Sequence, residues 1–434
     1  MLKTLLKKLV TFLITLEAQA VLRMYKPRII AITGSVGKTS TKDAIYSALA
    51  PRVFVRKSEK SFNSELGIPL TILGRPNAWN NPLRWIENLV DGLVLILWRT
   101  KYPQWLVLEV GADRPGDISS VAKWLSADIV VITRLPDVPV HVEFFDTPGD
   151  VVREKASLLR ALKPDGVFIA NADDKQVLAL RDAVPGQSVT FGFSLGSDIH
   201  GKDLRLLTEP DSSIPAGVAA TVALQSGGES ATLQCMGTIG SHALSPLLAA
   251  CAVGHVLGFN IAEVAEGLAG HIPPPGRMRL ILGLKGSRII DDTYNASPAA
   301  TLAALDALAL AGKAKRTIAV LGDMLELGRY SFEQHREVGA KVAATCDMLV
   351  TVGFRARDIA EGALNAGMSD GAIMQFEDAR KTGEYLQGII EKGDLLLIKG
   401  SQSMRMERTV EEVMAEPERA EELLVRQESE WKRR

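Results

Sequence analysis

A short apolar strand that runs directly into a glycine-rich loop and a helix most constrains what this 434-residue chain folds into. Residues 29–33 are Ile, Ile, Ala, Ile and Thr, which is typical of a strand buried on both faces. The loop GSVGKTS follows at once, and residues 39–49 have helical spacing. A strand, a glycine loop with Lys-Thr and a helix, in that order, predict a phosphate-binding loop.

Each residue type in this loop has a chemical reason. Backbone N–H groups close around phosphate oxygens, and the helix N-terminus adds positive potential. Lys38 is expected to reach the β- and γ-phosphates, and Thr39 to offer its hydroxyl to Mg²⁺. The common motif has a further glycine where Ile32 stands, so this loop is a shortened variant, and a glycine turn that merely precedes a helix is the alternative. The nucleotide-binding residues assigned here are Gly34, Ser35, Val36, Gly37, Lys38, Thr39 and Ser40.

From residue 28 onward, short β-branched segments alternate with longer helical ones, which favours a parallel sheet covered by helices. We expect strands at 28–33, 105–110, 128–133 and 166–171, and helices at 39–49, 151–162 and 247–257. Residues 202–239 alternate differently, with turns at Pro210-Asp211 and Gly227-Gly228, and predict a small antiparallel insertion at the sheet edge. The fold class is therefore α/β, with a central doubly wound sheet domain that carries the phosphate loop.

Three consecutive prolines at 273–275 predict a linker, because proline donates no backbone hydrogen bond to a helix or a central strand. Beyond it, strands expected at 288–291, 317–321, 348–352 and 395–399 indicate a second, Rossmann-like α/β domain. We therefore expect an N-terminal helix at 1–27, a central domain at 28–272 and a C-terminal domain at 273–434. Residues from 407 onward carry mixed charges and most simply form a solvated face.

The first 27 residues predict an amphipathic helix. Its leucines recur at helical spacing, with lysines and threonines opposite; they are Leu2, Leu5, Leu6, Leu9, Leu13 and Leu16. The segment imitates a secretory signal but is too short and too two-faced to span a bilayer, as is the apolar stretch 89–98. We expect the leucine side to pack on the following domain; the alternative is weak contact with an anionic membrane surface through the lysines.

Composition narrows the function. The chain has 50 basic and 51 acidic residues and a net charge of −1, so nucleic-acid binding is not expected. Its three cysteines are far apart and form no CxxC pair, which favours a reducing compartment, the cytoplasm, over a zinc ribbon or a disulfide framework.

Two polar residues stand at the ends of predicted strands. Glu109 ends the apolar strand 105–110, and strand C-termini face the ligand crevice of a doubly wound sheet, so it is expected to bind Mg²⁺. His141 follows the next strand and is either a second metal ligand or a hydrogen-bonded loop residue.

At this point the sequence resembles the Mur ligases, ATP-dependent amide-bond-forming enzymes of peptidoglycan synthesis. The resemblance covers nearly the whole chain after residue 26. It rests on the ordered stretches ITGSVGKTSTK, FNSELGIPLTIL, LVLEVGADRPGDI, HVEFF followed by EKASLL, NADD, PPGRM, IIDDTYNASPAA, IAVLGDMLELG and LLIKGSQSMRMERTV. DDTYNASP and GDMLELG favour the branch that adds D-alanyl-D-alanine to a UDP-linked muramoyl-tripeptide. An ADP-forming ligase that uses ATP and two Mg²⁺ ions is implied.

The resemblance implies a catalytic set of Lys38, Glu109, His141 and Lys155. Lys38 would hold the ATP phosphates, Thr39 and Glu109 one Mg²⁺, and His141 and Lys155 the second. Lys155 would react with CO2 to give a carbamate, whose anionic oxygen ligates a cation as an ammonium cannot. A neutral amine is required, hence a desolvating site. Without the resemblance, Lys155 is an ordinary solvated helix lysine.

Further residues come from the same resemblance. Asn171 would approach the nucleotide, and Arg277 would reach ATP from the C-terminal domain. The adenosine end would be completed by Asp292, Tyr294 and Asn295, for which a strand-end turn is the alternative.

Substrate contacts are implied at Lys399 and Ser401, for the carboxylate of the dipeptide, and at Asn63 on the substrate side of the central domain. A solvated strand end is the alternative for Lys399. His335 is a candidate base for the amine, or else a helix-surface histidine.

Two departures from the family pattern stand out. Only about 28 residues precede the phosphate-loop strand, too few for the N-terminal UDP-sugar domain usual in this branch, so that domain is expected to be missing. Ala243 and Pro246 stand where the family usually has asparagines, which leaves adenine contacts from that segment open.

The implied reaction activates a substrate carboxylate as an acyl phosphate, which an amine then attacks. Two other readings remain: a ligase of the same superfamily that acts on a carboxylate without UDP, and a nucleotide-dependent regulatory protein without ligase activity. A regulatory protein needs no second metal site, so Glu109, His141 and Lys155 together argue against it.

Overall fold

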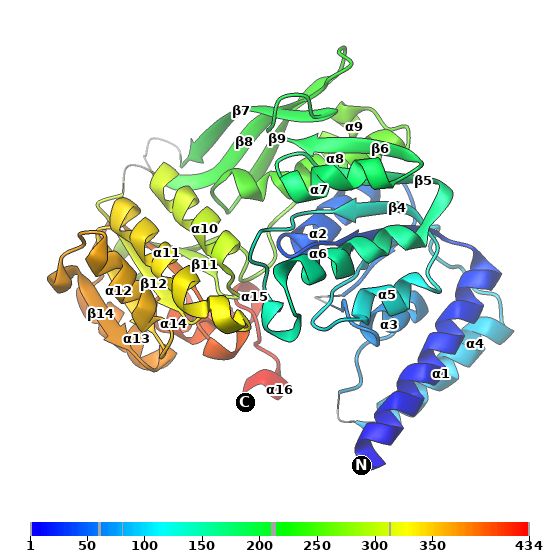
Figure 1. Ribbon diagram of the computed structural model, residues 1–434, viewed down its shortest axis with the longest axis horizontal. Helices are drawn as coiled ribbons and strands as arrows, with labels where there is room; N and C mark the ends of the chain where they lie inside the picture. Colours follow the sequence, from blue (N-terminus) through cyan, green and yellow to red (C-terminus); the bar gives the residue numbers. More distant parts are fainter. Residues whose placement is uncertain (1, 60–61, 80, 210–213, 312–313, 433–434) are drawn as a thin grey trace.

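The computed structural model describes residues 2–59, 62–79, 81–209, 214–311 and 314–432, with side chains of the first helix described from Lys8 onward. Within these residues, the N-terminal two thirds form a nine-stranded sheet in the order β2-β3-β1-β4-β5-β6-β7-β8-β9 (Figure 1). The strands are β1 Arg28–Thr33, β2 Val55–Lys57, β3 Trp105–Glu109, β4 Ala127–Ile132, β5 Leu162–Asn171, β6 Gln187–Gly192, β7 Ile199–Thr208, β8 Pro215–Leu224 and β9 Ser230–Met236.

Helices cover both faces of this central sheet, so its inner strands are apolar on both sides. Ile30 and Ile32 point to the face covered by α2, α8 and α9, and Ile29 and Ala31 to the face covered by α1, α3 and α5. The helices are α1 Leu2–Tyr25, α2 Lys38–Leu49, α3 Gly67–Leu73, α4 Pro82–Leu97, α5 Asp117–Ala122, α6 Pro148–Ala156, α7 Lys175–Ala179, α8 Ser245–Val256 and α9 Ile261–Leu268.

A second sheet follows the proline segment 273–275, which connects α9 to β10. In the described residues it has six strands in the order β10-β11-β15-β12-β13-β14, all parallel except β10. The strands are β10 Arg279–Leu282, β11 Arg288–Asp292, β12 Arg316–Gly322, β13 Met348–Val352, β14 Ile373–Phe376 and β15 Asp394–Lys399. The helices are α10 Pro298–Leu310, α11 Ser331–Thr345, α12 Arg357–Asn365, α13 Ala379–Ile389, α14 Glu407–Val413, α15 Ala420–Leu423 and α16 Ser429–Lys432.

The predicted fold class is confirmed. Strands β2 to β7 pair in parallel, and β7, β8 and β9 form the antiparallel insertion at the edge. The Gly227-Gly228 turn joins β8 to β9, whereas the turn expected at Pro210-Asp211 lies outside the described residues. The helix expected at 151–162 is shorter: α6 ends at Ala156, a 3-10 segment follows, and Leu162 already begins β5.

The N-terminal helix packs on the central domain through the face opposite to the expected one. Ile14, Ala18 and Val21 are fully buried, in the same apolar cluster as side chains of α3. The expected packing stripe is instead exposed where it is described, at 52%, 38% and 45% for Leu9, Leu13 and Leu16. The helix has two apolar faces, and close approach of its neighbours selects the one that carries the small Ala18.

The chain end beyond residue 407 is only in part the solvated face that the sequence predicted. Glu407 and Arg426 are both buried and form an ion pair of 2.8 Å. Val410 and Val413 of α14 join the apolar core beneath the second sheet. Other charged residues of this region, such as Glu418, Arg419 and Glu421, are exposed, so the chain end has one buried side, whose charges are paired, and one solvated side.

Candidate active site

A cleft of about 1690 Å³ lies between the two sheets and is lined from both. The phosphate loop and the end of β3 form one wall, and residues after β11 and β15 form the other. The proline segment 273–275 lines the cleft where the two walls join. Ordinary small-molecule pockets hold roughly 300–1,000 Å³, so this cleft is large enough for more than one substrate.

The phosphate loop is held by β4, the neighbour of β1. Thr133 donates from its hydroxyl to the carbonyl of Val36 at 2.7 Å, and the Ser35 N–H donates to the carbonyl of Arg134, also at 2.7 Å. A Cβ on Gly34 would lie 2.1 Å from the Thr133 hydroxyl, and its φ of +141° is one that other residues rarely adopt. Glycine is therefore required where the loop begins.

Lys38 begins α2 and curls back over this loop. Its ammonium donates to the carbonyl of Gly34 at 2.8 Å. Burial lowers the pKa of Lys38, and the nearby Glu109 carboxylate opposes that shift. The Lys38 ammonium therefore lies at the phosphate loop, where the Glu109 carboxylate balances only part of its positive charge.

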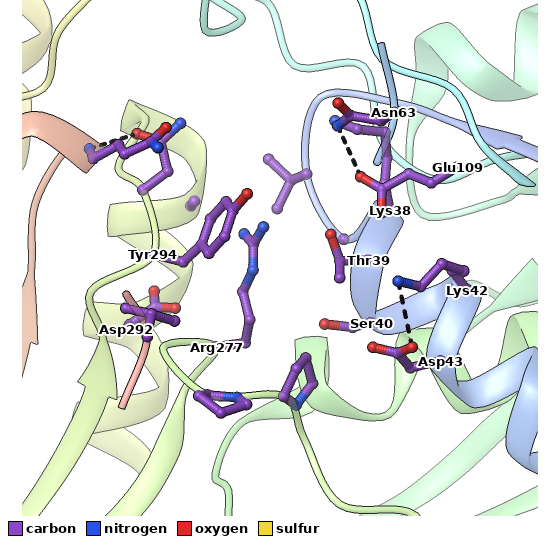
Figure 2. A pocket seen from close by; sticks show the side chains of 18 of the residues that line it. Lys38, Thr39, Ser40, Lys42, Asp43, Asn63, Glu109, Arg277, Asp292 and Tyr294 are labelled. Atoms are coloured by element: carbon purple, nitrogen blue, oxygen red, sulfur yellow. Dashed lines mark hydrogen bonds and ion pairs between the residues drawn. The ribbon is translucent and has the colours of Figure 1, made fainter. Parts of the chain in front are cut away.

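Glu109 reaches the loop because β3 pairs in parallel with β1, with Glu109 in register with Ile32. The carboxylate is buried, and its Oε1 accepts a hydrogen bond of 3.0 Å from the Asn63 amide (Figure 2). Its Oε2 is buried and has no hydrogen-bond partner in the described part of the chain. A carboxylate oxygen kept from water and left unpaired suits a bound cation, so Glu109 fits the predicted role in binding Mg²⁺.

His141 lies where the two halves of the chain meet. It has a φ of +70°, and its Nδ1 is 2.6 Å from Oε2 of Glu326, which comes from the C-terminal half. Its Nε2 is 3.5 Å from Oδ1 of Asp113. The Glu143 N–H also donates to the carbonyl of Glu326 at 3.2 Å. The imidazole is thus placed between two carboxylates, one from each side of the cleft.

Lys155 is in the last turn of α6 and is buried, so the solvated-lysine interpretation is wrong. Burial lowers the pKa of Lys155 to about 7, and the positive charge of Lys38 acts in the same direction. About half of its amine is neutral at pH 7 as a result. Lys155 is not among the residues that line the cleft; it lies behind the wall, within electrostatic reach of Lys38 and Asp113.

Arg277 and Tyr294 project toward the phosphate loop from the opposite wall (Figure 2). The Arg277 guanidinium carbon lies 3.9 Å from the centre of the Tyr294 ring, which is a close cation–π contact. The Arg277 Nε is buried and finds no hydrogen-bond partner within the residues that the structure describes. Arginine presents several donors in a planar fork, so this group is suited to an anionic ligand in the cleft.

Asp292, Asn295, Lys399 and Ser401 also line this wall, and each of them already has a hydrogen-bond partner within the protein. Asp292 and Lys399 stand in register on β11 and β15 and form a buried ion pair. Lys399 also donates to the carbonyl of Asn295 at 2.9 Å, and Ser401 accepts from the Leu325 N–H at 2.8 Å. The solvated alternative for Lys399 is therefore wrong.

Asn171 ends β5 and lines the cleft, as do Thr39 and Ser40. Its amide donates to the carbonyl of Thr133 at 2.6 Å and its oxygen accepts from the Asp173 N–H at 2.9 Å. Both ends of the side chain are thus used within the protein. In this position Asn171 fixes the loop after β4, which in turn holds the phosphate loop.

Sequence reasoning missed several residues of the site. Lys42 and Asp43, one turn into α2, line the cleft and form an ion pair of 3.5 Å (Figure 2). Asp43 also forms an ion pair of 2.6 Å with Lys57. The spacing of Lys42 and Asp43 from Lys38 on one helix was the available signal. His242 lines the cleft as well, and burial lowers its pKa to about 4, so it is neutral at pH 7.

His335 is neither a surface residue nor a candidate base. It is buried in α11, its Nδ1 is 2.7 Å from the carbonyl of Ser331, and its Nε2 accepts from the Met324 N–H at 3.0 Å. Burial also lowers its pKa. Both ring nitrogens are engaged in the fold, so the imidazole has no free position for proton transfer.

Two families match the sequence along its length. Residues 32–254 match the Mur ligase middle domain, and residues 276–402 match the domain described as "Mur ligase, glutamate ligase domain". The first match alone spans more than half of the chain.

Two curated relatives share one name and cover most of the chain. The UDP-N-acetylmuramoyl-tripeptide–D-alanyl-D-alanine ligase of Bacillus subtilis (strain 168) is 30% identical over 92% of this chain and 79% of its own length. That of Mycobacterium leprae (strain TN) is 32% identical over 87% of this chain and 71% of its own length. The solved MurF ligase of Thermotoga maritima in complex with ADP is 27% identical, with a TM-score of 0.73 over 93% of this chain and 83% of its own. With its phosphate loop, its two-walled cleft and these matches, the chain belongs to the Mur ligase family.

Proposed function

We propose that this protein joins D-alanyl-D-alanine to a UDP-linked muramoyl-tripeptide, with conversion of ATP to ADP. The observation that carries the proposal is the convergence of Lys38 and Glu109 from one wall with Arg277 and Tyr294 from the other on a single cleft. Support comes also from the shared name of the relatives and from the ADP in the Thermotoga maritima structure.

In the first step, a carboxylate oxygen of the tripeptide attacks the γ-phosphorus of ATP, and ADP leaves. Lys38 and the N–H groups of the phosphate loop stabilise the charge that develops on the phosphate oxygens. In the second step, the neutral amine of the dipeptide attacks the acyl carbon, phosphate leaves, and the amine loses a proton. Closure of the cleft, with residues 273–275 as a hinge, would keep water from the acyl phosphate.

Two Mg²⁺ ions would neutralise phosphate charge in this cleft. Thr39 and the unpaired Oε2 of Glu109 would hold one of them. His141 and Lys155 are proposed for the second, with Lys155 as a carbamate; its buried amine is partly neutral near pH 7, which the reaction with CO2 needs. Among the described residues, no group of three or more His, Cys, Asp or Glu side chains can hold a metal ion, so phosphate or water oxygens would complete both sites.

The remaining site residues keep their proposed roles. The ATP end would be bound by the loop residues Gly34 to Ser40 and by Asn171, Arg277, Asp292, Tyr294 and Asn295. Asn63, Lys399 and Ser401 are proposed for the peptide substrates. Contact of α1 with a membrane surface also stays a prediction, and none of the described helices is long and apolar enough to cross a bilayer.

The test incubates the purified protein with ATP, Mg²⁺, D-alanyl-D-alanine and the UDP-linked tripeptide and weighs the products. We expect a product with the combined mass of the two substrates less one water, and one ADP for each product. Lys38→Ala should lower the rate by about 10³-fold or more, because it removes the cation at the phosphates. Lys175→Ala, at an exposed lysine, serves as the control.

Two results would redirect the proposal. ADP formation at the same rate with and without the tripeptide, and no amide product, would favour a nucleotide-dependent regulatory protein. Product formed only when another carboxylate replaces the UDP-linked tripeptide would favour a related ligase.

A further inference from the structure

The first helix and α4 form a projecting pair at the end of the molecule far from the C-terminal sheet (Figure 1). The two helices run in the same direction, because their C-terminal ends meet. The Tyr25 hydroxyl donates to the carbonyl of Leu95 at 2.9 Å and accepts from the Thr100 N–H at 3.1 Å. Farther along, Oε2 of Glu17 lies so close to Gly92 that a Cβ there would be 2.1 Å away.

Both helices are apolar on the outside as well as on the inside. On α4, an inner set that includes Trp85 and Leu89 packs against the core. Its outer stripe, spaced at three and four residues, is 41–74% exposed and consists of Leu83, Ile86, Val90, Leu93, Val94 and Leu97. On α1, the stripe Leu9, Phe12, Leu13 and Leu16 is 38–59% exposed. We call these ten side chains, with Trp98, the α1–α4 face.

This face is a concentration of apolar surface, not a random scatter. It holds 11 of the 24 large apolar side chains that are exposed among the described residues. Single exposed apolar residues are normal on soluble proteins, but this many on two helices that pack together mark a surface that binds a partner.

The charged residues at the borders of the α1–α4 face favour a negatively charged partner. Exposed cations stand near both ends of the helix pair: Lys8 and Arg84 near the N-terminal ends, and Arg23, Arg99 and Lys101 near the C-terminal ends. The acids of the described part are fewer and mostly withdrawn. Asp91 pairs with Arg75 at 2.8 Å, and Glu17 is buried, which leaves Glu87 exposed.

We propose that the α1–α4 face docks on an anionic phospholipid bilayer, with both helices in the plane of the headgroups. Leucine, phenylalanine and tryptophan side chains enter the boundary of the acyl chains, and lysine and arginine at the borders meet lipid phosphates. A second copy of this chain is a poorer partner, because two such faces would bring like charges together at their borders.

The test is flotation of the full-length protein with vesicles, without substrates. Vesicles of phosphatidylcholine alone are compared with vesicles that contain about 30 mol% phosphatidylglycerol, at low and at high salt. The double variant Phe12→Asp/Leu97→Asp changes two side chains of the face that are 59% and 71% exposed. The matched control is Leu195→Asp/Phe354→Asp, at two side chains 94% and 75% exposed elsewhere.

We expect the wild-type protein and the control to float with the anionic vesicles, less so at high salt, and the face variant to partition at least about tenfold less. All three should unfold at similar temperatures, because the substituted side chains are exposed. The proposal is overturned if the wild-type protein stays with the soluble fraction or if both variants bind alike. A concentration-dependent dimer that only the face variant loses, without vesicle binding, would assign the face to a second copy. Ligase activity is not measured here, so failure of this proposal leaves the proposed reaction untouched.

Discussion

The two walls of the cleft differ in how they treat their buried carboxylates. On the wall of the central sheet, Glu109 keeps a buried oxygen that has no hydrogen-bond partner among the described residues, and the Lys38 ammonium donates to a backbone carbonyl rather than to a carboxylate. On the C-terminal wall, Asp292 and Lys399 neutralise each other. An unpaired buried charge lowers the stability of the protein and is available to bind a ligand of opposite charge, whereas a paired one is part of the fold. The central wall is therefore organised for binding charge, and the other wall for holding Arg277 and Tyr294 in position.

The variant Glu109→Gln is the most direct test of this difference between the walls. The variant keeps the shape of the side chain but removes the negative charge proposed to bind Mg²⁺, so we expect kcat/KM to fall by about 10²- to 10³-fold. Its thermal stability should be equal to or above that of the wild type, because the oxygen that is replaced has no hydrogen-bond partner among the residues that the structure describes. Ligase assays over a range of Mg²⁺ concentrations and thermal unfolding check both parts. A rate within twofold of the wild type would remove Glu109 from the site.

For Asp292→Asn we expect a loss of stability, which is the effect that Glu109→Gln should not have. It leaves the Lys399 ammonium buried without its counter-ion, and we expect the free energy of unfolding to fall by about 3–5 kcal/mol. The control is Glu377→Gln, which breaks an exposed ion pair with Arg357 and should cost about 1 kcal/mol or less. Urea unfolding at pH 7 measures both. Equal losses in the two variants would show that burial of the Asp292 pair has no energetic effect.

The variant Lys155→Met tests whether a buried amine on the central wall makes the stability of the protein depend on pH. The pKa of Lys155 is about 7 in the folded protein and near 10.5 in the unfolded chain, so the unfolded chain binds more protons between these values. Wild-type stability therefore gains from this group as pH rises from 7 toward 10.5 and loses that gain as pH falls through 7. We expect the variant to be the more stable protein at pH 7 by several degrees, with a gap that narrows as pH rises.

The exposed-site control for that measurement is Lys175→Met, which should follow the wild type at every pH. If Lys155→Met also follows the wild type, the amine is not desolvated in solution. Retention of the wild-type ligase rate in this variant would separately exclude a catalytic role for Lys155.

Glu17 extends the comparison beyond the cleft and gives the smallest expected effect. Burial between α1 and α4 raises its pKa to about 7, and no described residue forms a hydrogen bond with its Oε2. The folded protein therefore binds the extra proton between pH 4.5 and 7, and stability from this group is lost as pH rises through 7. Glu17→Gln should remove that loss and raise the Tm at pH 8 by a few degrees.

Glu87→Gln, on the exposed side of α4, is the control and should leave the Tm unchanged. A Glu17→Gln variant that melts like the wild type at both pH 5 and pH 8 would show that this carboxyl is hydrated.

The sequence located those parts of the site that local order determines. A strand followed by a glycine loop and a helix identified Lys38 and Thr39, and the rule that parallel strands end at one edge placed Glu109 beside them. The contact of Glu326 with His141 was not predictable in this way, because 185 residues separate the two and only the meeting of the two halves brings them together.

The spacing of apolar residues also did not predict which helix side chains are buried. Lys155 and His335 look like surface residues on their helices, yet both are buried, because the helix face that turns inward depends on its neighbours. The leucines of α1 show the converse error, since a helix with two apolar faces has no single predicted inner side. In each case the residue type can be read from the sequence, whereas the burial of its side chain depends on neighbours that the local pattern does not identify.

The backing of Tyr294 by the last residues of the chain has a practical consequence. Arg426 donates hydrogen bonds to the carbonyls of Thr293 and Tyr294 and pairs with Glu407, so the turn behind the aromatic ring is fastened by a side chain more than a hundred positions downstream. Shortening the expressed protein before Arg426 should weaken ADP affinity at a distance, and purification tags are better placed where they leave this fastening undisturbed.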